Sequence, residues 1–172
     1  MSIEDRVALV TGAGQGIGLE IARVLGQRGM LLAMNARSQK VEQAAETLHS
    51  EGVQAIAIRA DVTQKSEVEA MVERVEAELG PLWLLVNNAG ALTFGPTPDL
   101  TEAEWDICFN VDAKGVFLCS QAAIRRMIPR EEGRIINIGS IAGSIAREEQ
   151  IAYCSAKAAV NHFTRCLAVE MA

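Results

Sequence analysis

The chain lacks the cysteine spacing of a metal site or of a disulfide framework. Its four cysteines include no C-x-x-C pair and show no metal-ligand spacing: Cys108, Cys119, Cys154 and Cys166. Reduced thiols of this kind are typical of cytosolic proteins. We therefore expect a cytoplasmic protein without a bound metal.

The chain also lacks an excess of positive charge, a signal peptide and a long apolar run. Its 172 residues include 16 Lys and Arg against 22 Asp and Glu, a net charge of −6. No broad basic face for nucleic acid or an anionic membrane is expected from this balance. Residues 1–6 are charged and lead directly into an apolar strand, which argues against a secretory signal. No uninterrupted apolar run approaches the roughly 20 residues that span a bilayer.

What the chain does contain is an alternation of apolar strands and amphipathic helices. Short apolar runs, typical of strands buried on both faces, occur at 7–10, 31–35, 54–59, 82–86 and 135–138. Segments with helical spacing separate them and end at Gly29, Gly52 and Gly80. Ser38 is expected to cap the second helix, and a capping box at 101–104 opens a helical region to about residue 127. A last helix is expected from about residue 152 to the end of the chain.

This alternation predicts an α/β fold. Right-handed crossovers between parallel strands give a doubly wound, Rossmann-like parallel sheet with helices on both faces. No linker or internal repeat interrupts the pattern. We expect residues 1–172 to form a single dinucleotide-binding and catalytic domain, with strand 135–138 at an edge of the sheet.

A glycine-rich turn follows the first strand, in Thr11-Gly12-Ala13-Gly14-Gln15-Gly16-Ile17-Gly18. The strict dinucleotide fingerprint G-x-G-x-x-G fails, because the sixth position counted from Gly12 is Ile17. The spacing is instead T-G-x-x-x-G-x-G. Free N–H groups at the start of the following helix favour a phosphate there. The turn therefore predicts pyrophosphate binding, with an ordinary strand-to-helix connection as the alternative.

The end of the second strand lacks a carboxylate. An acidic residue at that place would bind a ribose 2′-hydroxyl and indicate NAD. Here the strand ends in Asn35-Ala36-Arg37-Ser38, and Arg37 is expected to bind a 2′-phosphate through a charge-assisted hydrogen bond. The pattern favours NADP over NAD, although Arg37 could also be a solvated residue before a helix.

Tyr153 and Lys157 are four residues apart near the start of the last predicted helix, and Tyr153 comes thirteen residues after Ser140. Residues at this spacing lie on one face of a helix. A free phenol titrates near pH ~10, and a fixed cation beside it favours the phenolate. The pair therefore suggests an acid/base group. The alternative is a surface Tyr and Lys on an amphipathic helix.

These motifs together resemble the short-chain dehydrogenase/reductase family. They are the glycine turn at 11–18, Asn87-Asn88-Ala89-Gly90, Ser140 and Tyr153-x-x-x-Lys157, in that order and spacing. The resemblance covers the whole chain. Within the family, the chain is most similar to the 3-oxoacyl carrier-protein reductase and sugar or alcohol dehydrogenase branch.

The resemblance implies an NAD(P)-dependent oxidoreductase acting on a small-molecule ketone or secondary alcohol. Tyr153 would be the general acid/base, Lys157 would bind the nicotinamide ribose, and Ser140 would hydrogen-bond the substrate carbonyl. Asn110 matches the family's helix asparagine, which helps to hold a water for proton relay. The cofactor would contact Gly12, Gln15, Gly16, Ile17, Gly18, Arg37, Asp61, Val62, Asn88, Ala89, Gly90, Tyr153 and Lys157.

The sequence departs from the family at its end. Family members continue past the last helix into a further strand, a substrate loop and a last strand, whereas this sequence stops at Ala172. We expect the C-terminal strands to be missing from a longer chain. The substrate is not readable from the residues present.

Two other functional classes are alternatives to this interpretation. A serine hydrolase needs G-x-S-x-G, whereas Ser140 stands in Gly139-Ser140-Ile141-Ala142-Gly143, and neither His49 nor His162 has the required place. A nucleotide-binding regulatory or scaffold protein without turnover stays open. By analogy with the family, whose corresponding helices pair between subunits, we expect a homo-dimer or homo-tetramer.

Overall fold

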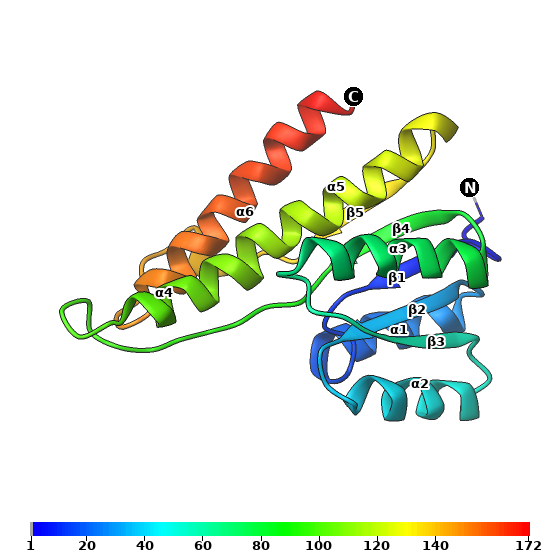
Figure 1. The fold of residues 1–172 in the computed structure, drawn as a ribbon, viewed down its shortest axis with the longest axis horizontal. Coiled ribbons are helices and arrows are strands. Elements are labelled where there is room, and N and C mark those ends of the chain that lie inside the picture. Colours follow the sequence, from blue (N-terminus) through cyan, green and yellow to red (C-terminus); the bar gives the residue numbers. More distant parts are fainter. Residues whose placement is uncertain (1) are drawn as a thin grey trace.

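Apolar runs form the strands of one parallel sheet in the computed structural model, which describes residues 2–172. The strands occupy the predicted places to within one residue at each end: β1 (Val7–Val10), β2 (Leu31–Ala36), β3 (Ala55–Arg59), β4 (Leu82–Asn87) and β5 (Arg134–Asn137). The helices are α1 (Gly16–Gln27), α2 (Lys40–Ser50), α3 (Lys65–Leu79), α4 (Glu102–Cys108), the π-helix η1 (Phe109–Lys114), α5 (Gly115–Met127), the 3-10 turns η2 (Ile128–Arg130) and η3 (Ile141–Gly143), and α6 (Ile151–Glu170) (Figure 1).

The strand order is β3-β2-β1-β4-β5, and every neighbouring pair is parallel. The first strand is therefore central, and all four of its residues are buried. The chain winds from β1 towards β3 on one side and then from β4 towards β5 on the other. Ligands of open parallel sheets bind beyond the strand carboxyl ends at such a reversal point.

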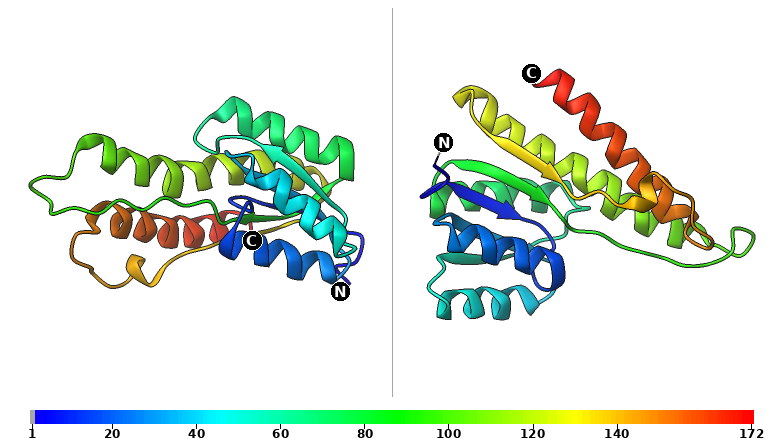
Figure 2. Two further views of the ribbon diagram at one scale, coloured as in Figure 1. Left: turned by 90° about the horizontal axis from the view of Figure 1, so that it is seen from below. Right: turned by 180° about the vertical axis from the view of Figure 1, so that it is seen from behind.

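Helices cover both faces of the sheet, which confirms the predicted doubly wound class (Figure 2). Side chains of β1 alternate between two cores, with Leu9 in one and Val10 in the other. The Leu9 core is completed by α3 and α5, for example through Val72 and Leu118. The Val10 core is completed by α1 and α2, for example through Val41.

The two predicted helix caps have different outcomes. Thr101 forms the predicted capping box with Glu104: its hydroxyl accepts from the Glu104 N–H at 3.2 Å, and the carboxylate accepts from the Thr101 N–H at 2.9 Å. The prediction for Ser38 is wrong. Gln39 precedes α2 with helical backbone angles, and its helix start has no side-chain cap. The carbonyl of Ser38, not its hydroxyl, accepts the N–H of Val41.

The stretch Glu102–Arg130 is long and apolar enough to cross a membrane by composition alone. Half of its most apolar window is buried inside the fold. Leu118 and Ala122 of α5 lie in the core between this helix and the sheet. Packing on the sheet therefore accounts for its apolar composition.

The last strand, β5, lies at the edge of the sheet as expected. Within residues 2–172 no strand pairs with its outer side, and Ile136 is 49% exposed. A cavity of about 660 Å³ lies beside it, between the end of α5 and the C-terminal turns of α6. Open edges of this kind are templates for pairing with another strand.

Candidate active site

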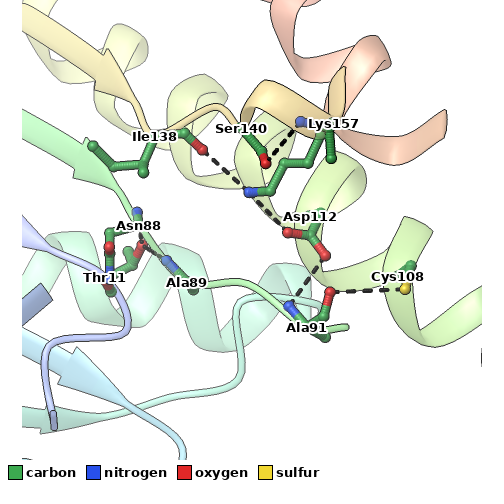
Figure 3. A network of polar contacts seen from close by, with 10 residues as sticks. Thr11, Asn88, Ala89, Ala91, Cys108, Asp112, Ile138, Ser140 and Lys157 are labelled. Carbon is green, nitrogen blue, oxygen red and sulfur yellow. Dashed lines mark hydrogen bonds and ion pairs between the residues drawn. The ribbon is translucent and has the colours of Figure 1, made fainter. Parts of the chain in front are cut away.

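Two loops meet where β1 and β4 end, and hydrogen bonds join them into one unit (Figure 3). The buried Thr11 hydroxyl accepts from the N–H groups of Asn88 and Ala89, each at 3.0 Å. The Asn88 side-chain amide donates to the carbonyls of Thr11 at 3.0 Å and of Gly12 at 3.2 Å. The amide N–H groups of Asn88 are therefore occupied within the protein, and this side chain holds the glycine turn in place.

The glycine turn needs its glycines for two different reasons. Gly12 has φ +65°, and a Cβ there would lie 2.8 Å from the Cα of Ala89, so no side chain fits between the two loops. Gly16 has φ +58°, but a Cβ there would meet nothing within 4 Å. Only backbone conformation selects glycine at position 16, and the space beside it is open. An open, amide-lined helix start is suited to a phosphate group.

A cavity of about 780 Å³ lies along this edge of the sheet. Most of the predicted cofactor-binding residues line it: Gly12, Gln15, Gly16, Arg37, Asp61, Val62, Asn88, Ala89 and Gly90. Residues that were not predicted also line it, namely Gly14, Asn35, Ala36, Ser38, Lys40, Ala60, Ala91 and Val111. Its volume is within the range of small-molecule and cofactor sites.

Four predicted cofactor-binding residues are not in this lining. Ile17 is 68% exposed, and Gly18 is buried beneath the turn beside Asn88. Tyr153 and Lys157 lie beyond the cavity on α6. The Lys157 ammonium is nevertheless close to the lining, since it would be 3.8 Å from a Cβ at Gly90.

The charged side chains of the cavity follow two strands, β2 and β3. Arg37 follows β2 and forms a long ion pair with Asp61 after β3, at 3.8 Å between Nη1 and Oδ2. Arg37 is 71% exposed and therefore free to reach a ligand. Lys40, which the sequence analysis missed, donates to the Gln15 side chain at 2.8 Å and adds a second cation.

Tyr153 and Lys157 share one face of α6, as their spacing predicts. The Lys157 ammonium lies 5.7 Å from the centroid of the Tyr153 ring. Lys157 is buried and donates to the carbonyl of Ile138, just after β5, at 3.1 Å. Among residues 2–172, nothing hydrogen-bonds the Tyr153 hydroxyl, which leaves it free for a ligand.

Ser140 lies after β5, where the backbone is extended before η3. Its Oγ accepts from the Ala142 N–H at 3.1 Å, so the hydroxyl hydrogen remains free to donate. The turn η3 packs closely on α6, because a Cβ at Gly143 would lie 2.8 Å from the Lys157 carbonyl oxygen. This contact keeps the Ser140 loop beside the helix that carries Tyr153.

Asp112, which is not among the predicted site residues, is completely buried in η1. Its Oδ1 lies 2.9 Å from the Lys157 ammonium, and its Oδ2 accepts from the Ala91 N–H at 3.1 Å (Figure 3). Burial raises the pKa of Asp112 above the usual aspartate range, while Lys157 and the Ala91 N–H act against that rise. A sequence signal existed: Cys108, Asp112 and Val116 are spaced by four on an otherwise apolar helix face.

Asn110, the predicted water-holding residue, lies two positions before Asp112. Its backbone carbonyl accepts from the Gly115 N–H, five residues further on, which is the bond of a π turn. In the described chain, no hydrogen bond connects the Asn110 side chain with Ser140, Tyr153 or Lys157. Among the described residues it is Asp112, and not Asn110, that pairs with the lysine.

Lys157→Met is expected to lower the free energy of unfolding by about 3–5 kcal/mol, because it leaves the buried Asp112 carboxylate without a cation. A raised folded-state pKa adds stability below the unfolded pKa and loses it as the pH rises through the folded value. The deficit should therefore be larger at neutral than at mildly acidic pH. Urea denaturation of the variant and the wild type at both pH values measures this difference.

The double variant K157M/D112N is the control for that measurement. Its neutral Asn removes the unpaired charge, so much of the lost stability should return. Equal deficits in the single and double variants would mean that the lost stability does not arise from the buried carboxylate.

Comparison with known proteins places this geometry in a family. The family model described as short chain dehydrogenase matches residues 6–172. The 5-keto-D-gluconate 5-reductase of Escherichia coli is 40% identical over 172 residues, which cover 99% of this chain and 68% of that protein. The 2,3-dihydro-2,3-dihydroxybenzoate dehydrogenase of Bacillus subtilis is 39% identical over 171 residues, covering 99% and 66%. A 3-oxoacyl-[acyl-carrier-protein] reductase of Staphylococcus aureus is 38% identical over 167 residues, covering 96% and 68%.

Solved structures agree with these matches. An actinorhodin polyketide ketoreductase crystallised with NADPH has a TM-score of 0.95 and 37% identity, over 96% of this chain and 65% of that one. A xylitol dehydrogenase with bound NAD+ has a TM-score of 0.95 and 31% identity, over 99% and 66%. The chain spans about two thirds of the length of the curated relatives it matches. The predicted family and branch are confirmed, and the chain belongs to the short-chain dehydrogenase/reductase family.

Proposed function

We propose that the protein transfers a hydride between a nicotinamide cofactor and a ketone or secondary alcohol. The observation that carries this proposal is the Lys157 ammonium on the same helix face as Tyr153, beside a cavity at the reversal point of the sheet. The named relatives support it, since they are dehydrogenases and reductases of small molecules. The two named structures contain NADPH or NAD+.

The residues present fit a dinucleotide. The open space beside Gly16 suits the pyrophosphate, and Asp61 and Val62 would lie along the adenine. Asn88 to Gly90 would follow the ribose, with the Asn88 side chain holding the turn. When bound, the nicotinamide ring supplies or accepts the hydride.

The protein's own side chains would orient the substrate and transfer the proton. Ser140 has a free hydroxyl hydrogen with which to bind a substrate oxygen. The Tyr153 hydroxyl would give its proton to that oxygen in reduction and take it back in oxidation. Lys157 would hold the ribose hydroxyls and favour the phenolate. We keep Asn110 as a candidate for holding a water in the proton path.

Tyr153→Phe should lower kcat for ketone reduction by about 10²–10⁴-fold, because it removes only the proton donor. NADPH affinity should change little, since the ring remains. The measurement is NADPH oxidation over a panel of ketones, with cofactor binding followed by fluorescence. Ketone-dependent turnover that survives this change would refute the assignment of Tyr153. Binding of NADPH without turnover on any ketone by the wild type would favour a regulatory or scaffold protein.

We further propose that NADP is preferred to NAD. The exposed Arg37 and the neighbouring Lys40 provide cations where a 2′-phosphate would lie, and no carboxylate ends β2. Arg37→Ala should weaken NADPH binding by about tenfold and NADH binding much less. This is the low end for a charge-assisted hydrogen bond, because solvent screens an exposed side chain.

Arg28→Ala is the matched control, since Arg28 is an exposed arginine at the end of α1, outside the cavity. It should leave both affinities unchanged. Equal losses of NADPH and NADH affinity in the Arg37 variant would contradict a role in phosphate recognition.

Self-association is also proposed. Large apolar side chains on α4 and α5 are exposed: Trp105 (36%), Ile107 (47%) and Phe117 (44%). Exposed apolar patches on soluble proteins mark interaction sites. Sedimentation at micromolar concentration should show a homo-dimer or homo-tetramer, and Phe117→Glu should dissociate it. A wild-type monomer under these conditions would exclude the proposal.

A further inference from the structure

One charged group in the site has no part in the proposed reaction. Asp112 is fully buried, and within residues 2–172 the Lys157 ammonium is the one cation paired with it. A buried carboxylate costs free energy unless it is paired and hydrogen-bonded. Its position beside a lysine expected to act on Tyr153 therefore calls for a functional explanation.

Asp112 connects three separate parts of the site through Lys157 and Ala91. Its Oδ2 binds the Ala91 N–H, at the end of the loop that follows β4, while its Oδ1 contacts Lys157 of α6. Lys157 in turn reaches the Ile138 carbonyl after β5. A Cβ at Gly90 would lie 3.0 Å from Asp112 Oδ1, so the β4 loop approaches the ion pair closely.

We propose, on the basis of the proposed function, that Asp112 is a positioning residue that orients the Lys157 ammonium and offsets its charge, and so sets how strongly Lys157 favours the Tyr153 phenolate. An uncompensated ammonium near a phenol stabilises the negative phenolate. A carboxylate 2.9 Å from the same ammonium opposes that effect. The electrostatic potential at the Tyr153 hydroxyl is then the sum of the contributions of the ammonium and the carboxylate.

Few other ionisable groups face this pair. The pair lies on η1 and α6, and the elements packed on these two are α4, α5 and η3. Arg125 and Arg126 of α5 are exposed, as are His162 and Arg165 of α6. The turn η3 has no ionisable side chain, and Lys114 of η1 and Glu102 and Asp106 of α4 are exposed. Glu104 is partly exposed and held in the capping box. The neighbouring thiols are those of Cys108 and Cys154. Among residues 2–172, the Asp112 carboxylate is therefore the one buried negative group against Lys157.

The chain allows a direct test, because Tyr153 is its only tyrosine. The near-ultraviolet absorbance of the phenolate then reports Tyr153 alone, without cofactor, substrate or turnover. We would titrate the wild type and the variants D112N and D112S with increasing pH. Both variants remove the charge and keep an acceptor for the Ala91 N–H.

Both variants should move the midpoint of phenolate formation to lower pH by about one unit, because Lys157 then acts unopposed. Lys157→Met should move it in the opposite direction. Asp106→Asn is the matched control: it removes an exposed aspartate six residues earlier and should leave the midpoint unchanged.

An unchanged or raised midpoint in folded D112N and D112S would overturn the proposal. Failure of both variants to fold, judged by thermal denaturation, would assign Asp112 a purely structural role and would overturn it as well. The titration is independent of turnover. A lowered midpoint in a protein that reduces no ketone would therefore support the ion-pair effect while counting against the oxidoreductase function.

Discussion

A lysine ammonium and an aspartate carboxylate, both removed from water, join α6 and η1 at the edge of the sheet where the strands end. Each of these charges would be unfavourable alone in the interior, so each constrains the other. Through backbone bonds at Ala91 and Ile138, the pair also joins the ends of two neighbouring strands. This pair is one of the contacts that fix α6, and with it Tyr153, relative to the sheet; the close packing of η3 on α6 is another.

A second, neutral network organises the other half of the site. Thr11 and Asn88 connect the glycine turn with the loop after β4 through four hydrogen bonds. The Gly12 backbone allows these loops to approach each other. The two loops are thus held together by neutral hydrogen bonds between side chains and the backbone, whereas η1 and α6 are joined by a charged pair. The loop 88–91 belongs to both networks.

Much of this arrangement could be predicted from the sequence, because it follows from local patterns. Apolar runs and glycine positions located the strands, and the spacing of Tyr153 and Lys157 placed them on one helix face. The Asp112–Lys157 contact could not be predicted in this way, because the two residues are 45 positions apart in the sequence. In addition, Asp112 lies in a π turn, which no periodicity of the sequence indicates. Ser38 does not cap α2 because Gln39, a good helix former between Ser38 and the start of α2, already takes helical angles.

The π turn has a further consequence for how this helical segment can vary. It takes up one residue more per turn than an α-helix does, and one residue corresponds to about 100° of rotation. Deleting a residue from Phe109–Lys114 would restore a regular helix, and because the wider turn has already absorbed the extra residue, α4 and α5 would keep nearly the same relative rotation. Cys108 packs with Ala152 and Ala156 of α6, whereas Leu118 packs on the sheet. Both sets of contacts are therefore compatible with the loss of one residue from the π turn, whereas a deletion within α5 would rotate one end of that helix by about 100° relative to the other.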